Sequence, residues 1–152
     1  MLRKRHAAFT LLELMIIVAI LADLIVIAMP SFMRSRQFAQ NARFENDLRA
    51  ATAAFEMYSA ETNSYPPNSA LGVVPTGMGI YLKGVNWSAM NSVGGRWDWD
   101  NNRNGVVAGV AVVLPSSDDL RMTDIDLRLD NGILTTGGFR KMSSGRYTYI
   151  IE

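Results

Sequence analysis

An apolar run near the N-terminus constrains this chain more than any other feature. It extends over residues 9–29, stops at Pro30, and follows a basic segment at residues 3–5. A helix needs about 20 apolar residues to cross the hydrocarbon core of a bilayer. The sequence therefore predicts a membrane-spanning helix, with the basic segment on the cytoplasmic side, because cytoplasmic flanks are rich in Lys and Arg.

Glu13 interrupts this apolar run close to its start. A carboxylate in a membrane helix costs roughly 2.5–3.5 kcal/mol at the helix centre and less near an end, so it needs a partner. No basic side chain lies within one helical turn of Glu13. A cut between Ala8 and Phe9 would place the new amine of Phe9 about one turn away, on the same chain or on a neighbouring copy.

The segment from Ala8 to Pro30 resembles the N-terminal signature of type IV pilins and of the pseudopilins of type II secretion. The shared pattern is a short basic leader, a small residue, Phe-Thr-Leu-Leu-Glu and an unbroken apolar helix. The resemblance implies cleavage by a prepilin peptidase before Phe9, methylation of the Phe9 amine, and a helical filament in which Glu13 neutralises such an amine. The chain departs from the family at Ala8, where glycine is usual.

A secretory signal peptide is the competing interpretation of the same segment, because it also has a basic start and an apolar run. Here, however, the small residue Ala8 precedes the apolar run, so cleavage would leave the helix on the protein. The sequence Ile27-Ala28-Met29-Pro30 is a poor site for an ordinary signal peptidase. The order of segments therefore favours the pilin-type leader.

The composition excludes several classes of function. The chain has no cysteine, and its one histidine is His6, in the predicted leader. Disulfides, cysteine nucleophiles, histidine triads and histidine-bound zinc are therefore excluded from the mature chain. Removal of the leader turns the small net charge of +1 negative, so we expect no nucleic-acid binding. No nucleophile elbow or phosphate loop is present, and we expect a protein that is not an enzyme.

A second helical pattern follows the proline. Apolar residues recur at steps of four and three on one helical face: Phe44, Leu48, Ala51, Phe55 and Tyr58. The pairs Arg43–Asp47 and Glu45–Arg49 have i,i+4 spacing. The sequence predicts one helix over residues 10–61, bent at Pro30 and ended by the prolines at 66 and 67.

The remaining residues predict a small head. Strands are predicted at 96–100, 106–114 and 147–151, and short helices at 76–82 and around 122–129. A strand over 124–130 is an alternative to the second helix, since its apolar residues alternate. The predicted fold class is α+β, a long N-terminal helix with a small antiparallel sheet packed on its second half. The predicted segments are a leader (1–8), a membrane or filament-core helix (9–29), its amphipathic continuation (30–62) and a head (63–152).

The predicted hairpin contains a candidate metal-binding loop. Asp100, Asn102 and Asn104 place oxygen atoms at positions one, three and five of a calcium-type loop, and Gly105 follows. Position twelve is Ala111, which cannot coordinate. The resemblance raises interest in calcium, because major pseudopilins hold calcium in their heads. Two interpretations stay open: a polar hairpin turn, or a calcium site of Asp100, Asn102 and Asn104 completed by Asp98 or by distant acids.

Two further features invite a functional interpretation. Asp23 is a second carboxylate within the apolar run, and we hypothesise that it helps the helix loosen between Ala22 and Pro30 on assembly. Trp97 and Trp99 share one face of the first predicted strand. Such a pair is usually core packing, and a surface for a partner or a carbohydrate is the alternative.

Three functions are compatible with these observations. The first is a structural subunit of a filament, as a pseudopilin of a short periplasmic pseudopilus that drives protein export. The second is a type IV pilin of a surface pilus for adhesion or motility, and the third is a membrane-anchored binding module that does not polymerise. The pseudopilin interpretation implies an inner-membrane protein with its head in the periplasm. The implied partners are other copies of the chain, a prepilin peptidase, an assembly platform and minor pseudopilins.

Overall fold

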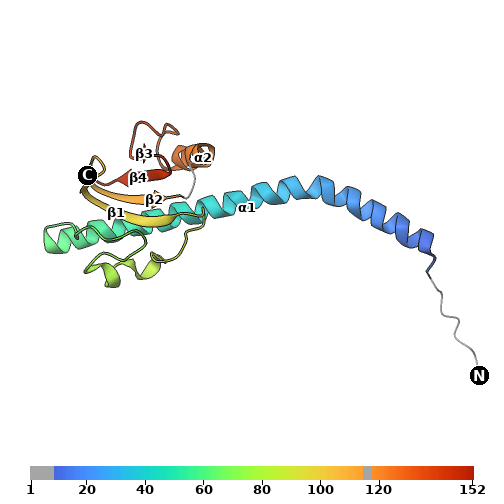
Figure 1. Cartoon of the computed structure of the whole chain (residues 1–152), viewed down its shortest axis with the longest axis horizontal. Coiled ribbons are helices and arrows are strands. Elements are labelled where there is room, and N and C mark those ends of the chain that lie inside the picture. Colours follow the sequence, from blue (N-terminus) through green and yellow to red (C-terminus); the bar gives the residue numbers. More distant parts are fainter. Residues whose placement is uncertain (1–8, 115–117) are drawn as a thin grey trace, which may run out of the picture. The chain divides into compact units, whose positions relative to one another are not determined.

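The computed structural model describes residues 9–114 and 118–152. The chain divides into two compact units, residues 1–39 and 40–152. Helix α1 (Leu11–Thr62) runs from the first unit into the second (Figure 1). The second unit also holds the sheet and helix α2 (Asp119–Leu129). The predicted α+β class, with a long N-terminal helix and an antiparallel sheet, is confirmed.

The first unit contributes the apolar half of α1. Every side chain from Phe9 to Ala39 is exposed in the single chain. In the described part of the chain, α1 is the one helix that is long and apolar enough to cross a membrane. Exposed apolar side chains at this density need lipid or other protein around them. Pro30 lies inside α1.

The second half of α1 buries the predicted stripe. Phe44, Leu48, Ala51 and Phe55 are buried, and Tyr58 packs against the same core. The helix ends at Thr62, where the hydroxyl donates to the carbonyl of Tyr58 at 2.8 Å. Four apolar residues at alternating steps thus place one face of the helix against the sheet, as the periodicity predicts.

The sheet is antiparallel, with the strand order β1-β2-β4-β3 (Figure 1). Its strands are β1 (Arg96–Arg103), β2 (Val106–Val113), β3 (Phe139–Ser143) and β4 (Arg146–Ile150). Asn104 and Gly105 connect β1 to β2 with φ angles of 54° and 82°. Positive φ at both positions is the type I′ geometry that Asn-Gly favours, and it matches the twist of the flanking strands.

Aromatic rings join the helix to the sheet. Phe44 stacks on Trp97 with ring centroids 5.2 Å apart, and Phe55 stacks on Trp99 at 3.8 Å. The Trp99 indole N–H donates to the carbonyl of Pro66 at 2.9 Å. Both tryptophans are buried, so the core-packing interpretation is confirmed and a tryptophan-lined surface is excluded for this pair.

Several predicted details differ from the structure. Strand β3 was not predicted, and residues 76–82 form no α-helix but two short 3₁₀ turns, Met78–Ile80 and Leu82–Gly84. Helix α2 settles the ambiguity around residue 125 in favour of a helix. The predicted pair Glu45–Arg49 is wrong, because Glu45 instead meets Arg128 of α2 at 3.4 Å.

Candidate functional site

The start of α1 is organised around Thr10 and Glu13. Glu13 Oε2 accepts hydrogen bonds from the Thr10 backbone N–H at 2.8 Å and from the Thr10 hydroxyl at 2.9 Å. In return, the Glu13 backbone N–H donates to Thr10 Oγ1 at 3.2 Å. This reciprocal arrangement is a capping box, and it satisfies donors that the first helical turn would otherwise leave unpaired.

The capping box fixes where the Glu13 carboxylate points. It folds back toward the helix N-terminus, one residue from Phe9, and Oε1 takes no part in the three bonds. Phe9 is 71% exposed. Ala8 and the rest of the predicted leader lie outside the described residues. The predicted cleavage site therefore stays a prediction, while its carboxylate partner is held at the end of the helix that cleavage would expose.

Asp23 and Pro30 lie further along the same half of α1. Asp23 is exposed, and it makes no hydrogen bond or ion pair among the described residues. Pro30 has no N–H, so the carbonyl of Val26 lacks its usual helical donor. The single chain is nevertheless helical throughout this segment. The proposed loosening concerns the assembled state and stays a prediction.

The candidate calcium residues fall on β1 and on its turn. Arg146 of β4 donates from Nη2 to Asp98 Oδ2 at 2.9 Å and to Asp100 Oδ1 at 2.5 Å. Asp98 is 4% exposed and Asp100 is fully buried. Burial lowers the pKa of Arg146, but hydrogen bonds and charge from Asp100 and Asp98 outweigh it and hold that pKa above its ordinary value. One guanidinium thus compensates two buried carboxylates.

Small residues on the central strand allow this contact. Arg146 extends from β4 across β2 to reach β1, and it must pass over the outer face of β2. Residues Gly109 and Ala111 occupy that face, opposite Asp100 and Asp98 in the register. A Cβ atom at Gly109 would lie only 2.6 Å from the methyl carbon of Thr148. The absence of side-chain bulk on β2 therefore lets the arginine and its carboxylates meet.

Calcium at these residues would have to compete with the arginine. The Asn104 side-chain amide donates to Asp100 Oδ1 at 2.7 Å, so it presents a donor where a metal needs an oxygen. Asn102 is exposed, and its amide donates to Asn101 at 3.0 Å. Among the described residues, no group of three or more His, Cys, Asp or Glu side chains could hold a metal ion. This arrangement favours the polar-turn interpretation, and the calcium site stays a prediction.

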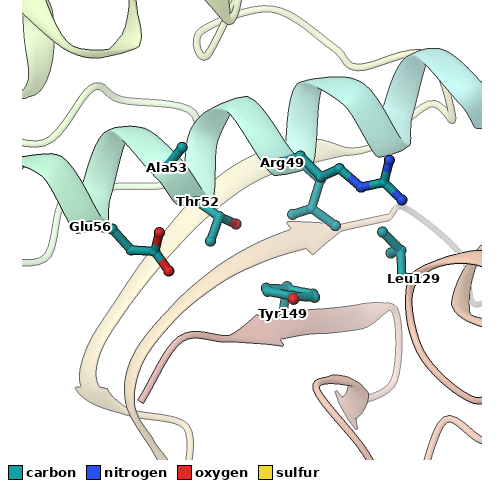
Figure 2. Close-up of a pocket in the computed structure, with 7 residues that line it drawn as sticks. Arg49, Thr52, Ala53, Glu56, Leu129 and Tyr149 are labelled. Carbon is teal, nitrogen blue, oxygen red and sulfur yellow. The ribbon is translucent and has the colours of Figure 1, made fainter.

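A separate hollow of about 240 Å³ lies between the second half of α1 and strand β4 (Figure 2). Arg49 and Glu56 extend from the helix at its two ends, and the Tyr149 ring faces the helix from the strand. The Thr52 hydroxyl is buried here and has no hydrogen-bond partner among the residues that the structure describes. The Glu56 carboxylate also lines the hollow but accepts no hydrogen bond from this hydroxyl, and we assign the hollow no catalytic role.

Sequence comparisons bear on the N-terminal site. Residues 3–29 match a family model described as the prokaryotic N-terminal methylation motif. The chain is 33% identical over 66 residues to the type II secretion system core protein G of Aeromonas hydrophila, covering 43% of this chain and 46% of that protein. It is 34% identical over 90 residues to the type IV wide pilus major component PilA4 of Thermus thermophilus, covering 57% of this chain and 69% of that protein. The chain belongs to the family of type IV pilins and type II secretion pseudopilins.

A further core protein G gives a longer match. The core protein G of Pseudomonas aeruginosa is 33% identical over 81 residues, which cover 51% of this chain and 57% of that protein. The chain thus spans about half the length of the core G pseudopilins that it matches. No solved structure gives a significant match. The predicted family is confirmed. The exposed apolar half of α1 is the feature that a pilin-type N-terminal helix predicts.

Two residues that form these sites were not predicted from the sequence. Thr10 forms the capping box with Glu13, and the spacing T-x-x-E was a signal that could have revealed it. Arg146 lies 46 residues beyond its partner Asp100, and no local pattern connects them. Its position could be known only once β4 was paired beside β2.

Proposed function

We propose that this pilin-like protein is a structural subunit of a filament, and that its filament is a type II secretion pseudopilus. The observation that supports this proposal most directly is the exposed apolar half of α1. Its first-turn carboxylate, Glu13, is folded toward the N-terminal end of the helix, which cleavage would expose. The matches to core protein G of Aeromonas hydrophila and Pseudomonas aeruginosa support the secretion branch. The chain would insert in the inner membrane, lose residues 1–8 and polymerise through α1.

The Glu13 carboxylate would neutralise the methylated amine of Phe9 on an adjoining copy. Burial of α1 among other copies removes water from both groups, which strengthens their attraction and makes either charge costly alone. In the single chain, Oε2 is bonded to Thr10, while Oε1 stays available. The incoming copy would therefore be held at the axial position where the two charges meet.

Three substitutions separate this role from helix capping. Glu13→Gln keeps a side chain that can close the capping box but removes the charge, Glu13→Ala removes both, and Thr10→Ala removes the hydroxyl cap but keeps the charge. We expect filaments, counted by electron microscopy after overexpression, to be lost in both Glu13 variants and retained with Thr10→Ala. Normal filaments from Glu13→Gln would show that the carboxylate acts only as a cap.

Processing between Ala8 and Phe9 is tested by mass spectrometry of the protein from its native cell. The proposal predicts a mature chain that begins with methylated Phe9. Retention of residues 1–8 in a protein that stays monomeric would contradict it. Processing by a prepilin peptidase also predicts that Ala8→Gly, which restores the usual family residue, is cleaved at least as fast as the natural chain in a pulse-chase experiment.

Asp23 and Pro30 would act during assembly rather than during insertion. Asp23 competes for backbone hydrogen bonds, and Pro30 already removes one, so the segment between them is the weakest part of the apolar helix. We expect Asp23→Leu to reduce filament yield while the protein still fractionates with membranes. Leu24→Ile in the same segment is the control, since it leaves the charge pattern unchanged. Equal filament yields from both variants would refute a role for Asp23.

A surface pilus is the second candidate, and the match to PilA4 favours it. The two filaments differ in what depends on them. In a strain that lacks the gene, loss of protein export with normal adhesion and motility supports the pseudopilus. Loss of adhesion or motility with normal export supports the pilus instead.

A further inference from the structure

Helix α2 presents apolar side chains on two faces. Met122 and Ile125 are buried against the head. Leu120 and Leu127, however, are 86% and 68% exposed. Asp124 lies between them at the i+4 position from Leu120, so the three side chains share one outer face with the order Leu-Asp-Leu. A helix that packs only against its own domain has a polar outer face. The two exposed leucines of α2 therefore indicate that its outer face contacts a second surface.

An apolar pocket of about 180 Å³ lies elsewhere on the same head. Its lining is formed by Leu71, Met90, Gly94, Arg96, Val113 and Leu114. Met90 is 63% exposed and Leu71 is 42% exposed, so apolar surface of the pocket faces outward. Arg96 supplies the one cationic group of this lining, and its residue is exposed at the start of β1.

The two surfaces complement each other in both chemistry and charge. Two leucines flank an aspartate on α2, and two exposed apolar residues accompany an arginine at the pocket. We propose that the outer face of α2 on one copy docks into this pocket on the next copy. Leucines from α2 would enter the pocket, and Asp124 would pair with Arg96 of the neighbour. This inference rests on the proposed filament, and it names the contact between successive heads.

The contact joins two different surfaces, so a docked pair still has one free α2 face and one free pocket. Such a head-to-tail interface does not saturate in a closed dimer, and it extends into an open array when the rotation between copies does not close. Burial of the exposed leucines would supply the driving force, because removal of apolar surface from water is favourable. The Asp124–Arg96 pair would set the register.

The absence of cysteine allows a clean cross-linking test. Full-length Leu120→Cys and Met90→Cys chains, each with a different epitope tag, are expressed together and treated with a short bis-maleimide. We expect a cross-linked species that carries both tags, and only a copy-to-copy contact can produce it. Ile80→Cys replaces Met90→Cys in the control, because Ile80 is also 67% exposed but lines neither surface. Equal cross-linking of the control would overturn the proposal.

A charge exchange provides the second test. We expect Asp124→Arg and Arg96→Asp each to lower filament yield at least several-fold, and the double variant to recover most of it. Normal yield from both single variants, or no recovery in the double variant with the head still folded by near-ultraviolet circular dichroism, would overturn the proposal. Filaments that depend on Glu13 but show neither cross-link nor charge effect would leave the proposed function intact and remove only this contact.

Discussion

The Arg146 guanidinium on β4 reaches across strand β2 and meets the Asp98 carboxylate on β1, with Nη2 and Oδ2 2.9 Å apart. The same nitrogen also contacts Asp100, which is fully buried. Strands β1 and β4, which are not neighbours in the sheet, are thus connected by side chains across β2. Because the two acids outnumber the base, the arginine is the group on which the arrangement depends.

Replacement of Arg146 by Met should destabilise the head strongly. Methionine fills similar space but leaves two buried carboxylates without their cation, and breaking a buried pair costs about 3–5 kcal/mol. Urea unfolding of the full chain in detergent micelles, followed by tryptophan fluorescence, measures this loss. The control is Arg103→Met at the exposed end of β1, which should change the free energy of unfolding little. Equal effects would show that Arg146 contributes no more than a surface residue.

Calcium should leave the unfolding temperature of the natural chain unchanged. Both carboxylates of the candidate site are held by Arg146, and the Asn104 amide presents a donor there. Thermal unfolding in millimolar calcium and in excess chelator makes the comparison, with magnesium as the control for ionic strength. A rise of several degrees that calcium alone produces would instead support a metal site in this head.

Asp126 should make stability depend on pH. Burial and the neighbouring Asp130 carboxylate raise the pKa of Asp126, while the backbone N–H groups of Ile133 and Gly132 oppose this shift. The folded state then binds the proton more tightly than the unfolded state, so the free energy of unfolding falls as pH rises through the folded pKa. Asp126→Asn should therefore stabilise the chain at neutral pH.

The stabilisation by Asp126→Asn should shrink as pH falls through the folded pKa, and it should vanish below the ordinary value of 3.8. Chemical unfolding at a series of pH values measures this difference between the variant and the natural chain. Asp124→Asn on the exposed face of α2 is the control. A constant gain at all pH values would mean that Asn improves packing and that the charge is irrelevant.

A side chain at Gly109 should disturb the sheet. A Cβ atom there would lie 2.6 Å from Thr148 Cγ2 and 3.1 Å from the Tyr149 carbonyl oxygen. Overpacking of this kind costs about 1–3 kcal/mol, so Gly109→Ala should lower the free energy of unfolding by that amount. Thr148→Ser removes the offending methyl group and should recover part of the loss in the double variant.

Gly79→Ala is the control for this experiment, because a Cβ atom at Gly79 meets nothing within 4 Å. The control should be neutral or slightly stabilising, since alanine restricts the unfolded chain. If Gly109→Ala behaves like Gly79→Ala, the close approach of β2 and β4 is not a source of strain. If the double variant is no better than Gly109→Ala, the clash lies with the backbone of β4.

The helix and the hairpin could be predicted from local pattern alone. The stripe that includes Phe44 and Phe55 has helical spacing, and Asn104-Gly105 has the positive-φ preference that a type I′ turn requires. These signals depend on near neighbours in sequence. The predicted helix ends accordingly lie within one residue of the observed ends, Leu11 and Thr62.

Long-range contacts could not be predicted in the same way. In β3 only Phe139 is buried, so the strand lacks the alternation that marks a half-buried edge. Glu45 has Arg49 at favourable helical spacing, yet the fold brings Arg128 to it from α2, 83 residues away. A partner of that kind exists only after the elements have packed, and the same holds for Arg146 at the carboxylates of β1.

The aromatic stacks on the second half of α1 have a mechanical consequence. Tension along this part of the helix is passed to the sheet where the rings meet. There it acts on the Phe44–Trp97 and Phe55–Trp99 stacks together. Two ring stacks that are loaded at the same time share the force, whereas contacts that open one after another each bear it alone. A sheet held to its helix by two stacks in this way is suited to resist force along the helix axis.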